Sequence, residues 1–247
     1  MSRIKTPADI EIMRAGGHML ATVLSLLKSQ AEPGVTPKDL AMVAARELKA
    51  LGGEPVFLGY KGFPDVICIS VNDQVQHSIP TDTPLEEGDV VNFDFGVRYK
   101  GLVTDGGITV GIGNISREDQ RLLKGTEEAL NKAIDSLKDG IKVGDISARI
   151  EEILRGYDLG IVRELVGHGV GDVLHEEPEI PNYGHRGTGP VLKAGMTVAI
   201  EPIANLGGEQ IVLERDGWTL KTADGSNSAQ FEHTVLITAA GAEILTI

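Results

Sequence analysis

The feature that most constrains this chain is an internal repeat whose spacing is close to half of its length. Residues 85–94 follow the pattern L-x-x-G-x-x-V-x-x-acid, and residues 192–201 follow it again, 107 positions later (85 to 192). Both copies end on a carboxylate, Asp94 in the first and Glu201 in the second. Because this spacing is far longer than a solenoid repeat, we expect one domain over residues 1–247 that contains two related halves, 1–115 and 116–247.

A second acid follows in each half. Asp105 precedes the alternating apolar residues Ile108 and Val110, and Glu232 stands in the same relation to residues 235 and 237. Each of these acids is predicted to head a second strand. Each half therefore offers two carboxylates.

Apolar spacing predicts two helices in each half, followed by strands. Thr6-Pro7 with Asp9 and Thr36-Pro37 with Asp39 are typical helix start signals, and Ser116 with Asp119 opens the second half. Strands are expected over residues 66–71, 90–97, 108–112, 197–203, 210–213 and 234–238. The simplest architecture is two αβ halves that share a sheet, with their acids facing a common cleft.

The two acids of the first half are predicted to meet across a hairpin. The residues flanking Asp94 alternate so that Asp94 points away from the apolar face. With the turn centred on Tyr99-Lys100, Asp94 lies directly opposite Asp105, with Cβ atoms about 5 Å apart. Like charges this close favour a bridging cation, and solvated acids on an exposed polar face are the alternative.

The histidines strengthen the metal hypothesis. Gly167-His168-Gly169 places an imidazole between residues that let the backbone approach a ligand, and His175 follows seven residues later. One His with several carboxylates suits Mn, Fe, Co or Zn at a two-metal hydrolytic site. Any lone histidine, including His77, is more often a core or surface residue. Glu201 and Glu232 are flanked by apolar residues, where an acid without a partner is costly.

Composition narrows the possible partners. With 36 Asp+Glu against 23 Lys+Arg, the net charge of -13 opposes binding to nucleic acid or to anionic membranes. The single cysteine, Cys68, excludes an intrachain disulfide and fits a reducing cytoplasm. We expect no apolar segment of about 20 residues that could span a bilayer.

The motifs resemble those of type I methionine aminopeptidases, which have the pita-bread metallopeptidase fold. The resemblance covers nearly the whole chain and runs through Gly59-Tyr60, Cys68 to Asn72, His77 with Ile79-Pro80, Asp94, Asp105, Gly167 to Gly169, His175 to Pro178, Ile200 to Pro202, Asp216 to Thr219, Ser228 to Gln230 and Glu232 to Thr234. It implies an α+β fold in which two pseudo-symmetric halves share a curved, mainly antiparallel sheet with helices on the outer face.

The same resemblance implies the site. Two divalent ions, Co, Mn, Fe or Zn, would be held by Asp94, Asp105, His168, Glu201 and Glu232. A metal-activated water would attack the first peptide carbonyl, with Glu201 relaying the proton, His175 stabilising the tetrahedral oxygen and His77 contacting the scissile amide. The methionine pocket would comprise Tyr60, Phe63, Cys68 and Trp218.

Several positions depart from the family pattern. Phe57 replaces a small pocket residue, Lys61 a His, Leu174 a Phe and Leu165 an aromatic residue, while Gly106 replaces a Thr and is expected to remove a hydroxyl from beside the metals. A reshaped pocket and slower turnover are the expected consequences.

The implied partners are peptides and nascent chains that begin with methionine, and the ribosome exit region is a further candidate. A cytoplasmic monomer of the minimal bacterial kind is expected. Two rivals stay open: a proline-specific peptidase of the same fold, against which the missing N-terminal domain argues, and a noncatalytic binding protein. A metal-free hydrolase of this fold would not require all four acids.

Overall fold

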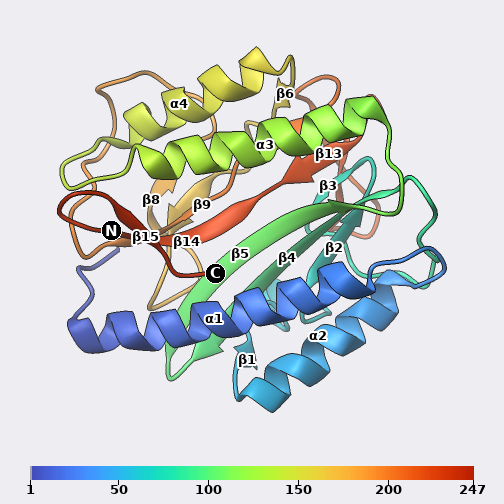
Figure 1. Cartoon of the computed structure of the whole chain (residues 1–247), viewed down its shortest axis with the longest axis horizontal. Coiled ribbons are helices and arrows are strands. Elements are labelled where there is room, and N and C mark those ends of the chain that lie inside the picture. Colours follow the sequence, from blue (N-terminus) through green and yellow to red (C-terminus); the bar gives the residue numbers. More distant parts are fainter. Residues whose placement is uncertain (1) are drawn as a thin grey trace.

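The computed structural model describes residues 2–247, and four α-helices dominate one side of it (Figure 1). The helices are α1 (Pro7–Gln30), α2 (Pro37–Leu51), α3 (Arg117–Asp135) and α4 (Val143–Gly156). The predicted start signals are confirmed: Thr6 and Thr36 each form a capping box with the Asp three residues later, and Ser116 caps α3. These caps satisfy N–H groups that the first helical turn leaves unpaired.

The helices cover an antiparallel sheet of nine strands. Its main path is β1 (Glu54–Pro55), β4 (Val90–Tyr99), β5 (Leu102–Gly111), β14 (Glu232–Ile237), β9 (Thr197–Ile200), β7 (Gly167–Gly169) and β8 (Glu176–Ile180). Off this path, β2 (Cys68–Val71) pairs with β4 and β15 (Ala242–Ile244) pairs with β14. Strands from the two halves are therefore hydrogen-bonded directly, at β5 and β14.

Two small sheets and a short 3₁₀ helix complete the fold. One sheet contains β13 (Ser228–Gln230), β10 (Ile203–Asn205) and β6 (Gly160–Ile161), and the other contains β11 (Ile211–Leu213), β12 (Leu220–Thr222) and β3 (Gln74–Gln76). The 3₁₀ helix η1 (Tyr60–Gly62) follows β1.

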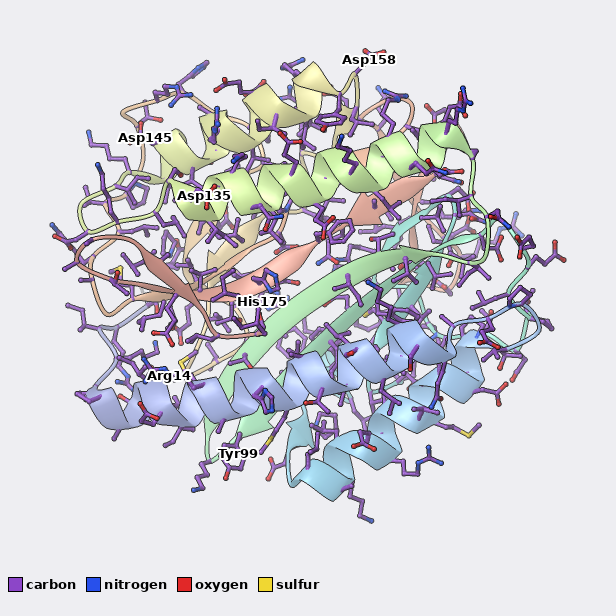
Figure 2. All side chains as sticks on the ribbon, in the orientation of Figure 1. Arg14, Tyr99, Asp135, Asp145, Asp158 and His175 are labelled. Carbon is purple, nitrogen blue, oxygen red and sulfur yellow. The ribbon has the colours of Figure 1, made fainter. Side chains whose placement is uncertain are left out.

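The two helix pairs lie on the same face of the large sheet, α1 and α2 over the strands of the first half and α3 and α4 over those of the second (Figure 1). Each helix pair packs on the sheet through a separate hydrophobic cluster. Phe93 and Phe95 of β4 are fully buried in the first cluster, and Val198 of β9 and Val235 of β14 in the second. The helix surfaces that face solvent carry charged groups such as Arg14 and Asp135 (Figure 2).

Equivalent hydrogen bonds recur at corresponding positions of the repeated pattern. Gly34 donates its backbone N–H to Leu85 O, and Gly140 donates to Leu192 O. Likewise Gly88 donates to the backbone oxygen of residue 112, directly after β5, and Gly195 donates to that of residue 237, the last of β14. The four glycines have φ between 85° and 97°, which is a conformation that glycine adopts without strain. The repeated pattern therefore marks repeated backbone geometry.

The predicted hairpin register is wrong, because the partner of each residue is shifted by two positions. The turn lies at Lys100 and Gly101, with φ of 46° and 88°, so that Asp94 pairs with Gly107 and Asp105 pairs with Gly96. A two-residue hairpin turn of this kind requires positive φ at both positions, which suits Gly101 far better than Tyr99. Asp94 and Asp105 stay on the same face as diagonal neighbours, because the shift preserves the alternation of side chains.

Two further expectations about elements need correction. Asp105 lies within β5 and does not head it, and the strand expected over residues 197–203 is divided at Glu201-Pro202 into β9 and β10. Proline has no N–H to donate to a sheet, which accounts for the division.

By length and composition alone, helix α1 could span a membrane. This differs from the expectation that the chain has no apolar segment of that length. Its buried residues, including Leu20 and Leu27, instead belong to the clusters against the sheet, and α1 contacts β4 and β5. A core helix accounts for this composition.

Candidate active site

One acid or histidine comes from each of five consecutive strands of the large sheet. Asp94 lies on β4, Asp105 on β5, Glu232 at the start of β14, Glu201 directly after β9, and His168 at the centre of β7. All five line one cavity of about 610 Å³. The sheet therefore brings together residues that are up to 138 positions apart (94 to 232).

The acids face away from the helix layer because of strand alternation. On β4, Phe93 and Phe95 pack beneath α1 and α2, so Asp94 between them points into the cavity on the opposite face. Position 106 obeys the same rule. A Cβ added at Gly106 would lie 3.1 Å from Leu20 Cδ2 on the helix side. The expectation that Gly106 removes a hydroxyl from beside the metals is therefore wrong.

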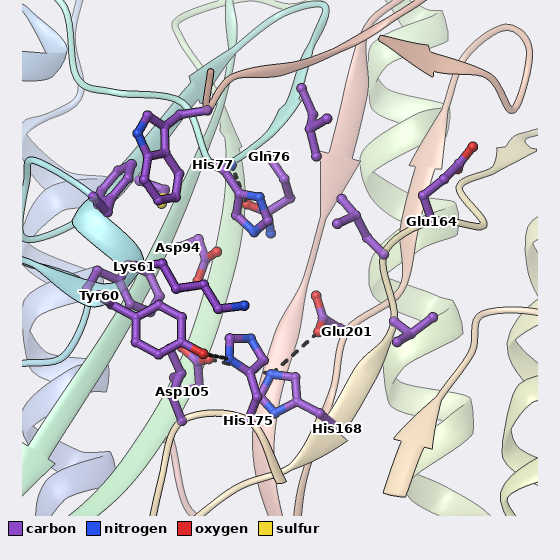
Figure 3. Close-up of a pocket in the computed structure, with 18 of the residues that line it drawn as sticks. Tyr60, Lys61, Gln76, His77, Asp94, Asp105, Glu164, His168, His175 and Glu201 are labelled. Carbon is purple, nitrogen blue, oxygen red and sulfur yellow. Dashed lines mark hydrogen bonds and ion pairs between the residues drawn. The ribbon is translucent and has the colours of Figure 1, made fainter. Parts of the chain in front are cut away.

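The donor atoms converge. Nε2 of His168 lies 3.8 Å from Asp105 Oδ2 and 3.7 Å from Glu201 Oε1, and Figure 3 shows these side chains meeting on the cavity floor. One donor atom each from Asp105, His168 and Glu232 lies within 4.8 Å of the others. Asp94 projects into the same cavity beside them (Figure 3).

Burial raises the pKa of all four carboxyl groups. The exposed fractions of Asp94, Asp105 and Glu232 are 6%, 4% and 3%, and loss of hydration is the main cause of each shift. The pKa of Asp105 rises to about 7, and repulsion among the acids further raises the pKa of Asp94, Glu201 and Glu232. A group of four desolvated acids is stable as anions only beside positive charge.

Within residues 2–247, no Lys or Arg forms an ion pair with any of the four acids. Asp94 Oδ1 and Glu232 Oε1 are buried and have no hydrogen-bond partner. His168 Nδ1 lies 2.9 Å from Gly169 O, so Nδ1 carries the proton and Nε2 presents its lone pair to the carboxylates. Four carboxylates and a neutral imidazole nitrogen fit a divalent cation.

A chain of amide side chains holds the Glu232 carboxylate in place. Gln230 Nε2 donates to Glu232 Oε2 over 2.9 Å, and Asn92 Nδ2 donates to Gln230 Oε1 over 2.8 Å. A Cβ at Gly107 would lie 2.2 Å from Gln230 Oε1, so glycine makes room for this amide. Such support orients ligands for an ion.

The other end of the cavity is apolar and aromatic. The Phe63 and Trp218 rings meet edge to face with centroids 5.2 Å apart, beside the buried Cys68. Four of the residues that depart from the family pattern, Phe57, Lys61, Leu165 and Leu174, also line the cavity. This end can accept an unbranched apolar side chain.

His175 and His77 also line the cavity (Figure 3). Nδ1 of His175 is 2.9 Å from the Tyr60 hydroxyl, and its ring centroid is 4.3 Å from that of His168. Burial, helped by the nearby His168 and Lys61, lowers the pKa of His175 to about 3. Burial also lowers the pKa of His77. Both imidazoles are therefore neutral near pH 7.

All eleven residues predicted from the sequence line this cavity. The prediction missed three polar lining residues, Gln76, Glu164 and Glu179. Gln76 directly precedes His77, and Glu179 pairs with His168 across β7 and β8, so only the pairing of distant strands could have identified Glu179. His233, the residue after Glu232, bonds to Thr246 Oγ1 on the other face of β14.

This fold and this buried cluster of carboxylates define a metallopeptidase, and the comparison with known families agrees. The model of metallopeptidase family M24 matches residues 11–239. The chain belongs to this family and is a hydrolase with the pita-bread fold.

Methionine aminopeptidases match this chain over nearly the full length of both proteins. Methionine aminopeptidase 1 of Bacillus subtilis is 43% identical over 242 residues, which cover 98% of each chain. The crystal structure of methionine aminopeptidase from Thermotoga maritima superposes with a TM-score of 0.98 at 44% identity and covers 100% of this chain and 99% of that one. The prolidase from Pyrococcus furiosus has a TM-score of 0.80 at 26% identity, and the match spans 65% of its length.

Proposed function

We propose that this protein removes the N-terminal methionine from peptides and nascent chains. The observation that carries the proposal is the single cavity, in which five potential metal ligands adjoin an aromatic and sulfur-lined pocket. Relatives named methionine aminopeptidases at about 40% identity over nearly the full length support it. Both halves contribute ligands, so we treat residues 1–247 as one catalytic domain.

The residues that would hold the metal are Asp94, Asp105, His168, Glu201 and Glu232. Five side chains from five strands provide enough donors for two divalent ions, and the mixture of oxygen and imidazole ligands suits Co, Mn, Fe or Zn. Such ions would polarise the substrate carbonyl and make water a nucleophile near neutral pH.

His175 is suited to stabilise the charge that develops on the carbonyl oxygen. The Tyr60 hydroxyl lies 2.9 Å from Nδ1 of His175, and with this hydroxyl as the donor the proton of the neutral imidazole would lie on Nε2. An Nε2–H group held in a buried site donates to an oxyanion more effectively than water does. Tyr60 thereby fixes both the tautomer and the orientation of His175.

Glu201 and His77 are assigned the proton transfers. The Glu201 side chain is only 11% exposed, and burial raises its pKa well above that of a free carboxyl group. A carboxyl group with a raised pKa is the stronger base, which suits Glu201 to accept a proton from water and to pass it on. His77 is neutral, lines the cavity and is assigned to contact the scissile amide and the leaving amine.

The pocket selects the side chain. Phe63 and Trp218 present aromatic surfaces, and Cys68 adds a polarisable sulfur, which together favour a thioether. Phe57 and Leu174 reshape the wall and are expected to tighten the choice of the first residue.

We place the activity in the cytoplasm, in agreement with a single cysteine that is buried and free. A monomer that acts on nascent chains near the ribosome exit is the arrangement we favour.

A competition assay tests the proposal directly. The protein is loaded with Mn²⁺ or Co²⁺ and offered Met-Ala-Ser together with Ala-Pro peptides, with Asp105→Asn as the inactive control. We expect release of methionine from Met-Ala-Ser and no cleavage of the Ala-Pro peptides. Cleavage of the proline peptides alone would favour the prolidase-like rival, and no hydrolysis at any metal concentration would favour a noncatalytic role.

A further inference from the structure

The segment Ser2–Lys5, ahead of α1, lies against the loop that carries His175. Lys5 N donates to Gly195 O over 2.7 Å, and Ser2 N donates to Glu177 O. Arg3 forms a two-point ion pair with Asp172, at 2.8 and 3.0 Å. The start of the chain is therefore joined to residues 172–177 although the two are about 170 positions apart.

Lys5 is the buried member of this contact. Its side chain has no exposed surface, and Nζ lies 3.1 Å from Ser2 Oγ, 3.4 Å from Arg3 O and 3.6 Å from Glu176 Oε2. An ammonium group buried in this way is costly unless a negative charge accompanies it. Glu176 is that charge, since its attraction opposes the lowering of the Lys5 pKa by burial.

Glu176 in turn holds the loop next to His175. Its Oε1 accepts from the backbone N–H groups of Asp172, at 2.6 Å, and Val173, at 3.2 Å. Its Oε2 is buried and has no hydrogen-bond partner, so the nearby Lys5 ammonium is its main electrostatic partner. The Glu176 carboxylate thus links Lys5 of the N-terminal segment to the backbone of residues 172 and 173, just before His175.

The fit around Lys5 is close. Gly171 has φ of 150°, and a Cβ there would lie 2.3 Å from Lys5 Cε and 2.6 Å from Nζ. Gly171 O accepts from Val103 N over 2.7 Å, which ties this point of the loop to β5. The outer pair of Arg3 and Asp172 is 42% and 48% exposed and therefore contributes little. The buried pair is the stronger candidate for fixing the loop.

We propose that Lys5 is a positioning residue for His175, acting through Glu176. Lys5 holds the Glu176 carboxylate, the carboxylate holds the backbone of residues 172–173, and the ring of His175 is thereby kept against the Tyr60 hydroxyl. The role rests on the proposed function, because it matters for catalysis only if His175 serves the reaction. Misplacement of a catalytic group by about 1 Å can cost up to 10²-fold in rate.

A double-mutant cycle tests the proposal. Lys5→Met, His175→Ala and the double variant are compared in kcat and KM on Met-Ala-Ser, with Lys132→Met as the control for loss of an exposed ion pair. Lys5→Met is expected to lower kcat about 10-fold with KM nearly unchanged and metal affinity retained. In the His175→Ala background the same change is expected to have no further effect, because groups that act as a unit are not additive.

An unchanged kcat in Lys5→Met, or an equal loss in both backgrounds, would overturn the proposal. If Lys5→Met does not fold, the same cycle with Glu176→Gln decides. Ring ¹⁵N NMR provides a readout that does not depend on activity. The His175 signals are assigned by their absence in His175→Ala. Lys5→Met should shift these signals and leave those of the exposed His185 unchanged. Unchanged His175 signals would refute the positioning role of Lys5. A wild-type protein that binds Mn²⁺ but releases no methionine refutes the proposed function, while the NMR result still decides on Lys5.

Discussion

Replacement of Asp105 by Asn should stabilise the metal-free protein while abolishing its activity. Asp105 is buried among three other acids, and its pKa rises from 3.8 to about 7. A carboxyl group whose pKa is raised in the folded state binds its proton more tightly there than in the unfolded chain. The metal-free wild type should therefore lose stability as the pH rises from about 4 through about 7.

The size of the effect follows from that shift. At about 1.4 kcal/mol per pKa unit, the difference between 3.8 and about 7 corresponds to about 4 kcal/mol above pH 7. Asn keeps an oxygen that can accept from the Gly106 N–H, now 3.1 Å from Asp105 Oδ1, and carries no charge. We expect a gain of about 2 to 4 kcal/mol in the unfolding free energy of the variant at pH 8, and less than about 1 kcal/mol at pH 4.

The assay is urea unfolding in the presence of a chelator at both pH values, repeated with saturating Mn²⁺. Asp135→Asn, at an exposed position on α3 (Figure 2), is the matched control and should change stability by no more than about 0.5 kcal/mol. Mn²⁺ should stabilise the wild type and leave Asp105→Asn unchanged. A metal-free wild type that becomes more stable from pH 4 to pH 8, or a destabilised Asp105→Asn, would refute the electrostatic argument.

Four further outcomes follow from the site and the packing. His175→Ala should keep metal, as measured by calorimetric titration, and lose about 10²-fold in kcat, whereas an equal loss of metal would contradict its assigned role. Tyr60→Phe removes the donor to His175 Nδ1 and should lower kcat about 10-fold with unchanged metal affinity, and an unaffected rate would show that the hydroxyl does not fix the tautomer. Trp218→Ala removes the edge contact with Phe63 and should raise KM for Met-Ala-Ser about 10-fold, with a smaller change in kcat. Gly17→Ala would stabilise an isolated helix by about 1 kcal/mol, but the new Cβ would lie 2.0 Å from Leu245 O. Denaturant unfolding should therefore show that the variant loses about 2 kcal/mol or more of unfolding free energy. An increase in unfolding free energy would contradict this close approach of α1 to the C-terminal segment.

The sequence alone determined what depends on local order along the chain. Helix periods and the caps at Thr6, Thr36 and Ser116 are decided by residues within a few positions of one another, so the helices could be predicted. The repeat is likewise visible as matching residues at a spacing of 107, which pointed to Asp94 and Glu201, and Asp105 and Glu232 were found because each precedes a similar alternating stretch. The face on which Asp94 and Asp105 lie followed from the alternation of side chains in a strand, which survives a shift in register by an even number of residues.

The tertiary structure decided what depends on which distant strands pair. The turn at Lys100-Gly101 set the register of the hairpin, and the order β4-β5-β14-β9-β7 brought the five predicted ligands to one cavity. Glu179 entered the cavity through its pairing with His168. Lys5 reached Glu176 across 171 positions (5 to 176). Such contacts are fixed by the packing of whole elements, and no pattern of neighbouring residues encodes them, because the free energy that selects them comes from burial shared by many segments.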